Sequence, residues 1–262
     1  MPGLTPQDLA PGDLRSASLD LARFSIAHIR SVDDPLFETA YALLWAEFGA
    51  RHEMERRETL ERRLALAPQM RYELLLVQHA GRPAAVRDHT AIRAAHGVVV
   101  HLSHNLVLPA WRRTGLAGWM RALPLLAARE LDPGAAVTLA AEMESPHGAD
   151  PARSIRLQAY EKAGFRKVDP AALRYHQPDF RAPGEIDAAG GPRPLPLQLV
   201  LRRVGREAET SIPGRDLRSI VRALYEMYGR QFRAADLQHP LLVQAGDIAP
   251  GREFALLPPT AP

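Results

Sequence analysis

The sequence predicts a mixed α/β fold in which helices flank one central, mostly antiparallel sheet. Apolar runs of strand length alternate along the chain with segments whose apolar residues recur at helical spacing. Of the 262 residues, 46% are apolar and 24% are charged, which is the profile of a globular protein and not of a disordered or fibrous one. The length suits one large domain, or one domain with extensions, and is short for two full-size domains.

The N-terminal part of the chain predicts an arm, a strand and two helices. Residues 1–21 are rich in proline, glycine and aspartate, so we expect an N-terminal arm or a disordered lead-in. Residues 24–29 predict a short strand. Asp34 and Pro35 then supply the cap and first turn of a helix. Residues 53–67 predict a second helix, whose exposed side is highly charged.

Two strands joined by a turn follow, at 72–78 and 84–92, and a third strand is predicted at 98–108. Alternation along this third strand separates a buried side from a side that we expect to form the floor of a polar cleft. The buried side carries one polar residue, His104, among Val98, Val100, Leu102, Leu106 and Leu108. The opposite side carries Val99, His101, Ser103, Asn105 and Val107.

The C-terminal half continues the alternation of helices and strands. Pro124 is expected to kink the first of these helices. In chain order we expect a helix at 115–131, a strand at 137–144, a helix at 151–163 capped by Asp150, a strand at 165–168, a long loop at 169–195, a strand at 197–203, a helix at 214–229 and a proline-rich tail at 238–262. The expected organisation is an arm at 1–21, a main domain at 22–205 and a C-terminal helix with its tail at 206–262.

The strongest local signal is the corner where the strand at 98–108 ends and the next helix begins. The first N–H groups of a helix have no internal partner and attract anions. Gly115 and Ala117 leave space for a phosphate to approach the backbone, and Arg112 and Arg113 add positive charge. The corner is therefore either a phosphate cradle or a plain connection between strand and helix. A second signal, at 160–165, is a helix end with a glycine cap.

Together, in this order, the two segments resemble the Gcn5-related N-acetyltransferase (GNAT) superfamily. Its acetyl-CoA signature is Arg or Gln, two residues, Gly, one residue, then Gly or Ala, and residues 112–117 fit it. The later Tyr-Glu-Lys-x-Gly-Phe segment is matched at 160–165, and the element order agrees from 24 to 204. The resemblance implies the acyl-CoA N-acyltransferase fold, here with a C-terminal helical extension. It also implies direct transfer of acetyl from acetyl-CoA to a primary amine of a small molecule or protein.

The resemblance also implies roles for individual residues. Tyr160 matches the acid that protonates the leaving thiolate, and His101 stands where a base is often found, with Glu142, Glu144 and a water chain as rivals. Backbone N–H groups near 106–107 would hold the thioester carbonyl. The residues expected to bind acetyl-CoA are Leu106, Val107, Leu108, Arg112, Arg113, Thr114, Gly115, Leu116, Ala117 and Ser154. Ser154 lies in a turn where the family often has an Asn, so the contacts expected there depart from the pattern.

Four residues are candidates for contact with the acceptor. Asp88 and His89 lie in a strand where buried charge is costly, so they border the acceptor pocket or face solvent at an edge. Ser103 shares the polar face of its strand with His101. Tyr175 opens the long loop, which could close over the acceptor.

Composition and residue spacing argue against cysteine chemistry, metal binding, nucleic-acid binding and membrane association. The absence of cysteine excludes disulfides and a cysteinyl intermediate. His101 and His104 are three apart on a strand and face opposite sides, so we expect no metal site. The formal charge is only +3 and the arginines alternate with carboxylates, so we expect no nucleic-acid partner. No apolar run is long enough for a membrane helix and no secretory signal is visible, so we expect a cytoplasmic protein without a membrane partner. The high count of alanine, arginine, proline and leucine with little lysine suggests a GC-rich genome, and we expect a bacterial protein.

Two alternatives stay open at this point. The apolar stripe of the helix at 214–229 needs a partner, which is either the chain's own sheet or a second subunit in a homodimer. The chain as a whole is either a catalytic acetyltransferase or a non-catalytic acyl-CoA-binding module that regulates or recruits another protein.

Overall fold

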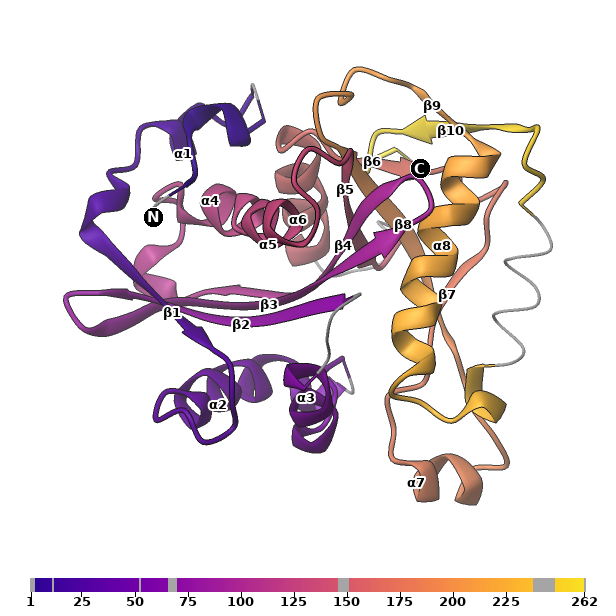
Figure 1. Ribbon diagram of the computed structural model, residues 1–262, viewed down its shortest axis with the longest axis horizontal. Coiled ribbons are helices and arrows are strands. Elements are labelled where there is room, and N and C mark those ends of the chain that lie inside the picture. The colour runs from indigo at the N-terminus through magenta and orange to yellow at the C-terminus, as the bar shows by residue number, and fades with distance from the viewer. Residues whose placement is uncertain are drawn as a thin grey trace. The chain divides into compact units, whose positions relative to one another are not determined.

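The computed structural model confirms the mixed α/β class and describes residues 3–10, 12–51, 53–65, 70–145, 151–237 and 248–261. The chain divides into two compact units (Figure 1). The first unit comprises Met1–Ala91 and Val100–Gly134, and the second comprises Ile92–Val99 and Ala135–Pro262. No helix in the described part of the chain is long and apolar enough to cross a membrane.

The first unit is built on four neighbouring strands. Phe24 lies opposite His79 in the antiparallel pairing of the first two strands. The second and third strands are joined by a two-residue turn in which Ala80 and Gly81 have φ of 48° and 73°. Two positive φ angles in such a turn match the twist of the strands that it joins. The strands follow the order β1 (Phe24–Ile29), β2 (Met70–His79), β3 (Arg82–Ala94) and β4 (Gly97–Val107).

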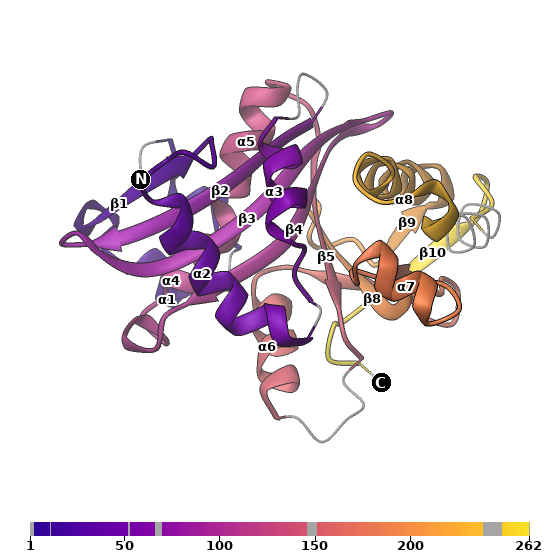
Figure 2. The same cartoon turned by 90° about the horizontal axis from the view of Figure 1, so that it is seen from below.

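Helices cover both faces of these four strands. Leu74 and Leu76 pack with the helices of one face, and the intervening Leu75 and Val77 pack with those of the other, as strand alternation requires. Figure 2 shows α2 and α3 lying across β2 and β3. One face carries α2 (Phe37–Phe48) and α3 (Arg57–Leu64), and the other carries α4 (Leu116–Ala122) and α5 (Pro124–Leu131). The break between α4 and α5 at Pro124 confirms the predicted kink.

The N-terminal segment is not a disordered lead-in, which corrects that expectation. It forms the short helices η1 (Pro6–Asp8), α1 (Leu14–Ala17) and η2 (Leu21–Arg23). Leu9 and Ala10 are buried, and Leu9 packs beside Trp119 of α4. A proline-rich segment with weak periodicity folds here because another element of the chain supplies its apolar partner.

The second unit contains the remaining strands and three helices. All of the strand pairings described in it are antiparallel. The strands follow the order β5 (Val137–Met143), β8 (Leu195–Arg203), β6 (Arg166–Val168), β10 (Glu253–Leu257) and β9 (Ser211–Pro213), with β7 (Tyr175–Gln177) also paired to β8. The helices are α6 (Pro151–Lys162), α7 (Pro183–Ala188) and α8 (Gly214–Gly229).

Several predicted boundaries are corrected here. The predicted helix at 53–67 is described only as Arg57–Leu64, and the predicted cap Asp150 lies outside the described residues. The predicted long loop contains β7 and α7, and the predicted tail contains β10. These short strands become strands only by pairing with β8, β6 and β9, so local sequence alone does not reveal them.

The apolar stripe of α8 is buried within this one chain. Leu217, Leu224 and Tyr228 have no measurable exposure, and Tyr225 is 1% exposed. Of the two partners expected for the stripe, the chain itself therefore provides one, and burial of this face does not require a second subunit.

Candidate active site

The corner after β4 has an unusual backbone. The 3-10 turn η4 (Pro109–Trp111) follows the strand, and Arg113 and Gly115 then have φ of 64° and 100° before α4 begins. A non-glycine residue at positive φ costs about 1–3 kcal/mol, and such residues are enriched in tight turns and at functional sites. The Arg112 and Arg113 side chains are exposed, while the Thr114 hydroxyl donates to the carbonyl of Trp111 at 2.8 Å. The corner thus presents two guanidinium groups beside a helix N-terminus.

The glycine of this corner has a structural role that the sequence did not reveal. A Cβ at Gly115 would lie 2.5 Å from the carbonyl oxygen of Arg15, and a Cβ at Gly118 would overlap the side chains of Asp13 and Ser16. The space that was expected to admit a phosphate at the α-carbon of Gly115 is therefore occupied by the N-terminal segment. Anion binding at this corner depends on its backbone N–H groups and on the two arginines.

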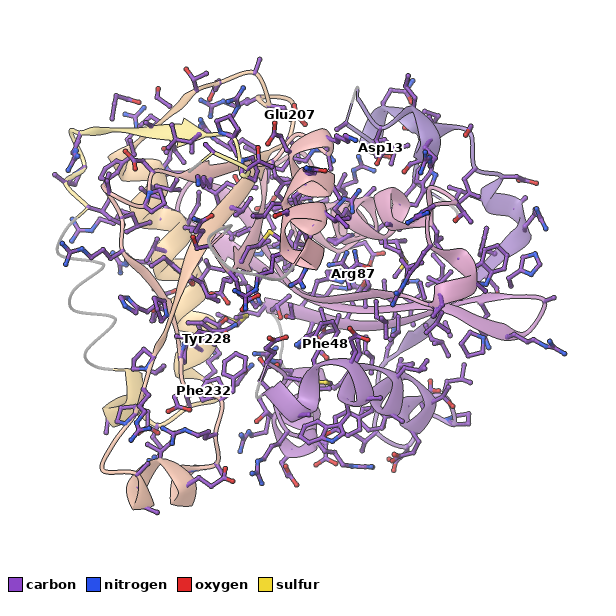
Figure 3. The ribbon with its side chains drawn as sticks, turned by 180° about the vertical axis from the view of Figure 1, so that it is seen from behind. Asp13, Phe48, Arg87, Glu207, Tyr228 and Phe232 are labelled. Atoms are coloured by element: carbon purple, nitrogen blue, oxygen red, sulfur yellow. The ribbon has the colours of Figure 1, made fainter. Side chains whose placement is uncertain are left out.

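The N-terminal segment is fastened to this corner by hydrogen bonds. The Ser16 hydroxyl donates to the carbonyl of Gly115 at 2.7 Å, and the Trp119 indole N–H donates to the carbonyl of Ser16 at 2.6 Å. The Asp13 carboxylate accepts from the Ser16 backbone at 3.2 Å and lies 3.6 Å from the guanidinium of Arg121. Asp13 is labelled in Figure 3. These contacts hold the start of α4 in place without using the Arg112 or Arg113 side chains.

Apart from Ser154, the remaining residues expected to bind acetyl-CoA lie along or beside the same corner. Val107, Leu108 and Ala117 are half-buried, and Leu106 and Leu116 are buried. On the polar side of β4, the Ser103 hydroxyl lies 3.1 Å from Nδ1 of His101. His101 is only 2% exposed and Ser103 is half-buried. The structure therefore brings the predicted base and Ser103 together on one strand.

Asp88 lies on the α2–α3 side of the sheet and is fully buried, as is its neighbour His89. Neither side chain is accessible to an acceptor in this arrangement, and neither faces solvent at an edge, which corrects both expectations. Asp88 accepts a hydrogen bond from the Tyr72 hydroxyl at 3.0 Å and lies 2.8 Å from Nδ1 of His104. Nε2 of His104 lies 2.9 Å from the carbonyl oxygen of Glu53.

His104 is held as an imidazolium by these contacts. Both ring nitrogens face acceptors, so both must carry a proton. Burial alone would lower the pKa of His104, but the Asp88 carboxylate outweighs burial and raises that pKa to about 9. Burial alone would raise the pKa of Asp88, but His104 holds it far below its usual value. A second buried ion pair, between Arg63 and Glu55, lies in the same part of the unit. Sequence reasoning missed this cluster, although His104 was the one polar residue on a buried face.

In the second unit, Tyr160 lies in the last turn of α6. It is half-buried, and its ring centroid lies 4.8 Å from that of Phe165. Gly164 has φ of 79° and ends the helix, and the Phe165 N–H donates to the carbonyl of Tyr160 at 3.1 Å. This cap confirms the predicted helix end at 160–165. Ser154, earlier in the same helix, is exposed.

Glu142 on β5 accepts hydrogen bonds from three side chains. It accepts from the hydroxyl of Tyr175, from Nε2 of Gln177 at 2.9 Å and from the hydroxyl of Tyr228 at 2.7 Å. Burial and the charge of Glu142 raise the pKa of Tyr175 well above its usual value. Tyr228, labelled in Figure 3, comes from α8, and its ring contacts that of Phe232.

Tyr175 and Glu144, the other two predicted site residues near Glu142 in the chain's second unit, have surroundings different from those expected. Tyr175 is 2% exposed and lies in β7 opposite Leu197 of β8, so it is a sheet residue and not part of a loop that closes. Glu144 forms an ion pair with Arg153 at 2.5 Å. The second unit therefore groups Glu142 with Tyr175, and the first unit groups His101 with Ser103. Among the described residues no group of three or more histidines and carboxylates is arranged to hold a metal ion.

Comparisons with known proteins give distant likenesses only. No protein-family model matches the chain, and no curated protein matches it. Among solved structures, a protein of the GNAT family from Bacteroides thetaiotaomicron matches 68% of this chain and 86% of its own, at 18% identity and a TM-score of 0.48. A GNAT family acetyltransferase from Elizabethkingia anophelis with acetyl-CoA bound matches 69% of this chain and 98% of its own, at 14% identity and a TM-score of 0.42. N-acetylglutamate synthase from Neisseria gonorrhoeae matches 69% of this chain and 35% of its own, at 15% identity and a TM-score of 0.41.

Proposed function

We propose that this protein transfers an acetyl group from acetyl-CoA directly to a primary amine of a small molecule or a protein. The observation that carries the proposal is the corner at 112–117, where a signature for acetyl-CoA coincides with a helix start and two exposed arginines. Helix N-termini and guanidinium groups are the protein's usual means of holding a pyrophosphate. The Tyr-Glu-Lys-x-Gly-Phe segment at 160–165 supports the same function.

The chemistry needs three contributions from the protein. The amine nitrogen attacks the thioester carbonyl, a C–N bond forms, and the C–S bond breaks as the thiolate leaves. A base takes the amine's proton, and we assign this task to His101, with Glu144 or water as alternatives. Backbone N–H groups near 106–107 hold the carbonyl oxygen, and Tyr160 gives its proton to the thiolate. Glu142 already accepts hydrogen bonds from Tyr175, Gln177 and Tyr228, which occupy the carboxylate oxygens that would have to take the amine's proton.

Thermal shift with acetyl-CoA tests the proposal first. A ligand present at 100 times its Kd adds about 2.7 kcal/mol to the stability of the protein. We expect a clear rise in Tm, and no rise at saturating acetyl-CoA would remove the assignment. A panel of primary amines assayed for thiol release then tests catalysis. A protein that binds acetyl-CoA but releases no thiol with any amine would instead be an acyl-CoA-binding module.

Replacing Arg112 or Arg113 by glutamine is expected to raise the KM for acetyl-CoA by about 3–10-fold, with a smaller change in kcat. Each substitution removes one charged donor from the corner and leaves the backbone N–H groups in place. The measurement is the acetyl-CoA dependence of the initial rate. Arg30→Gln, at an exposed arginine elsewhere in the first unit, is the matched control. Equal KM values for all three variants and the wild type would contradict a role for these arginines.

Replacing Tyr160 by phenylalanine is expected to lower kcat by about 10²-fold, because the leaving thiolate loses its proton donor. The affinity for acetyl-CoA should change by less than about threefold, since only a hydroxyl is removed. Rates with a good acceptor and calorimetric titration with acetyl-CoA measure the two effects separately. Tyr41→Phe, on α2 in the first unit, is the control. A Tyr160→Phe variant with the wild-type kcat would assign the acid role to another group.

A further inference from the structure

A groove in the second unit is lined by an unusual number of arginines. Arg93 and His96 come from the end of the β3–β4 hairpin, and Arg215, Arg218 and Arg222 come from one side of α8. The groove has a volume of 310 Å³, which is within the range of small-molecule sites. The three arginines of α8 are three and four residues apart, on the side of the helix away from its buried apolar stripe.

Positive charge in this groove exceeds negative charge. Among the described residues that line it, four are arginines and one, Glu226, carries a carboxylate. Glu226 lies 3.9 Å from Arg222, and both side chains are more than half exposed, so this pair is weak. Asp216 lies 3.7 Å from Arg215 but is shared with Arg203, which is closer at 3.2 Å. The groove therefore keeps a net positive charge.

Arg218 is the residue that points most directly to a ligand. Its side chain is half-buried, and its Nε is fully buried without a hydrogen-bond partner among the described residues. A buried donor that has no acceptor destabilises the folded protein, and a bound acceptor would remove this penalty. Arg181, by comparison, binds Asp179 through both Nε and a terminal nitrogen.

We propose that this groove binds a small anion carrying two or more phosphate groups. Guanidinium groups bind phosphate through two parallel hydrogen bonds, and several of them around one cavity suit several phosphates. The described lining contains no Phe, Tyr or Trp on which bases could stack, which disfavours a single-stranded nucleic acid. The lining of the groove also includes small residues such as Ala94 and Ala223, which leave room between the guanidinium groups.

Inorganic tripolyphosphate is the probe for the test, titrated calorimetrically into the full chain at about 0.1 M salt. We expect Arg218→Gln and Arg222→Gln each to weaken binding by tenfold or more, and Arg218→Lys to restore part of the affinity. The corner at 112–117 is the other place where phosphates could bind. An Arg112→Gln, Arg113→Gln double variant is therefore the matched control, which should retain binding to the groove.

The outcomes separate this site from the proposed acetyl-CoA site. Loss of tripolyphosphate binding in the Arg218 variant but not in the double variant supports the groove. Loss only in the double variant, unchanged affinity in Arg218→Gln, or no binding by the wild type would overturn it. Tighter binding of a 20-nucleotide single strand or of phosphatidylserine vesicles, lost in the same variants, would overturn the small-ligand assignment. None of these results depends on acetyl transfer.

Discussion

Replacing Asp88 by alanine is expected to lower the free energy of unfolding by about 3–5 kcal/mol. The substitution leaves the imidazolium of His104 buried without its counter-charge, and it also leaves the Tyr72 hydroxyl without its acceptor. Urea unfolding followed by circular dichroism measures the loss. Glu38→Ala, which removes an exposed partner of Arg57, is the control and should cost less than about 1 kcal/mol. Equal losses in the two variants would show that the buried pair contributes no more than a surface pair.

The same pair gives this prediction a second readout with a defined sign. The pKa of His104 is raised from 6.5 to about 9 in the folded protein. Its contribution to stability is therefore complete below pH 6.5 and is lost as the pH rises through 9. The lowered pKa of Asp88 makes its contribution present above about pH 4 and lost in stronger acid. The wild type should lose stability between pH 6.5 and 9.5, and Asp88→Ala should lose much less. If the free energy of unfolding of the wild type and that of Asp88→Ala changed with pH in the same way, this would argue against a stabilising ion pair between Asp88 and His104.

Replacing Gly115 by alanine is expected to cost about 2–4 kcal/mol of stability. The new Cβ would occupy a position at φ of 100° and would lie 2.5 Å from the carbonyl oxygen of Arg15, a backbone atom that cannot swing away. The N-terminal segment must therefore move off the start of α4. Chemical denaturation measures the cost, and limited proteolysis within 13–19 should become faster.

Gly134→Ala separates the two causes of this loss. Gly134 has a similar φ of 86°, but nothing lies within 4 Å of the position its Cβ would take. The Gly134→Ala variant is destabilised by backbone strain alone. The difference in the free energy of unfolding between the two variants therefore measures the contribution of the N-terminal segment packed at Gly115. If Gly115→Ala costs no more than Gly134→Ala, the segment does not depend on this glycine.

Regular elements with strong periodicity could be predicted from the sequence. The strand at 24–29 and the helix at 214–229 match the structure residue for residue, and in the helix the apolar spacing reports burial on one face. Elements that depend on partners could not be predicted. β7 exists through its pairing with β8, and α1 folds against α4, so neither carries a local signal of its own.

The candidate site was predictable only where it depends on local sequence. Positive φ at Arg113 and Gly115 follows from the turn that the motif at 112–117 makes. The pairing of Asp88 with His104 depends on the register of the β3–β4 hairpin, which no spacing in the sequence fixes. The role of Gly115 depends on a segment that is 99 residues away.

The separation of 99 residues between Ser16 and Gly115 has a consequence for folding during synthesis of the chain on the ribosome. The ribosome makes residues 13–18 long before it makes Gly115 and Trp119, to which Ser16 is hydrogen-bonded. At about 5–20 residues per second, the N-terminal segment waits roughly 5–20 s for its partners. During that interval Leu9 has no apolar surface on α4 to cover it. The segment at 13–18 is thus made well before the residues that it contacts, and a nascent chain arrested before α4 should show it as protease-sensitive.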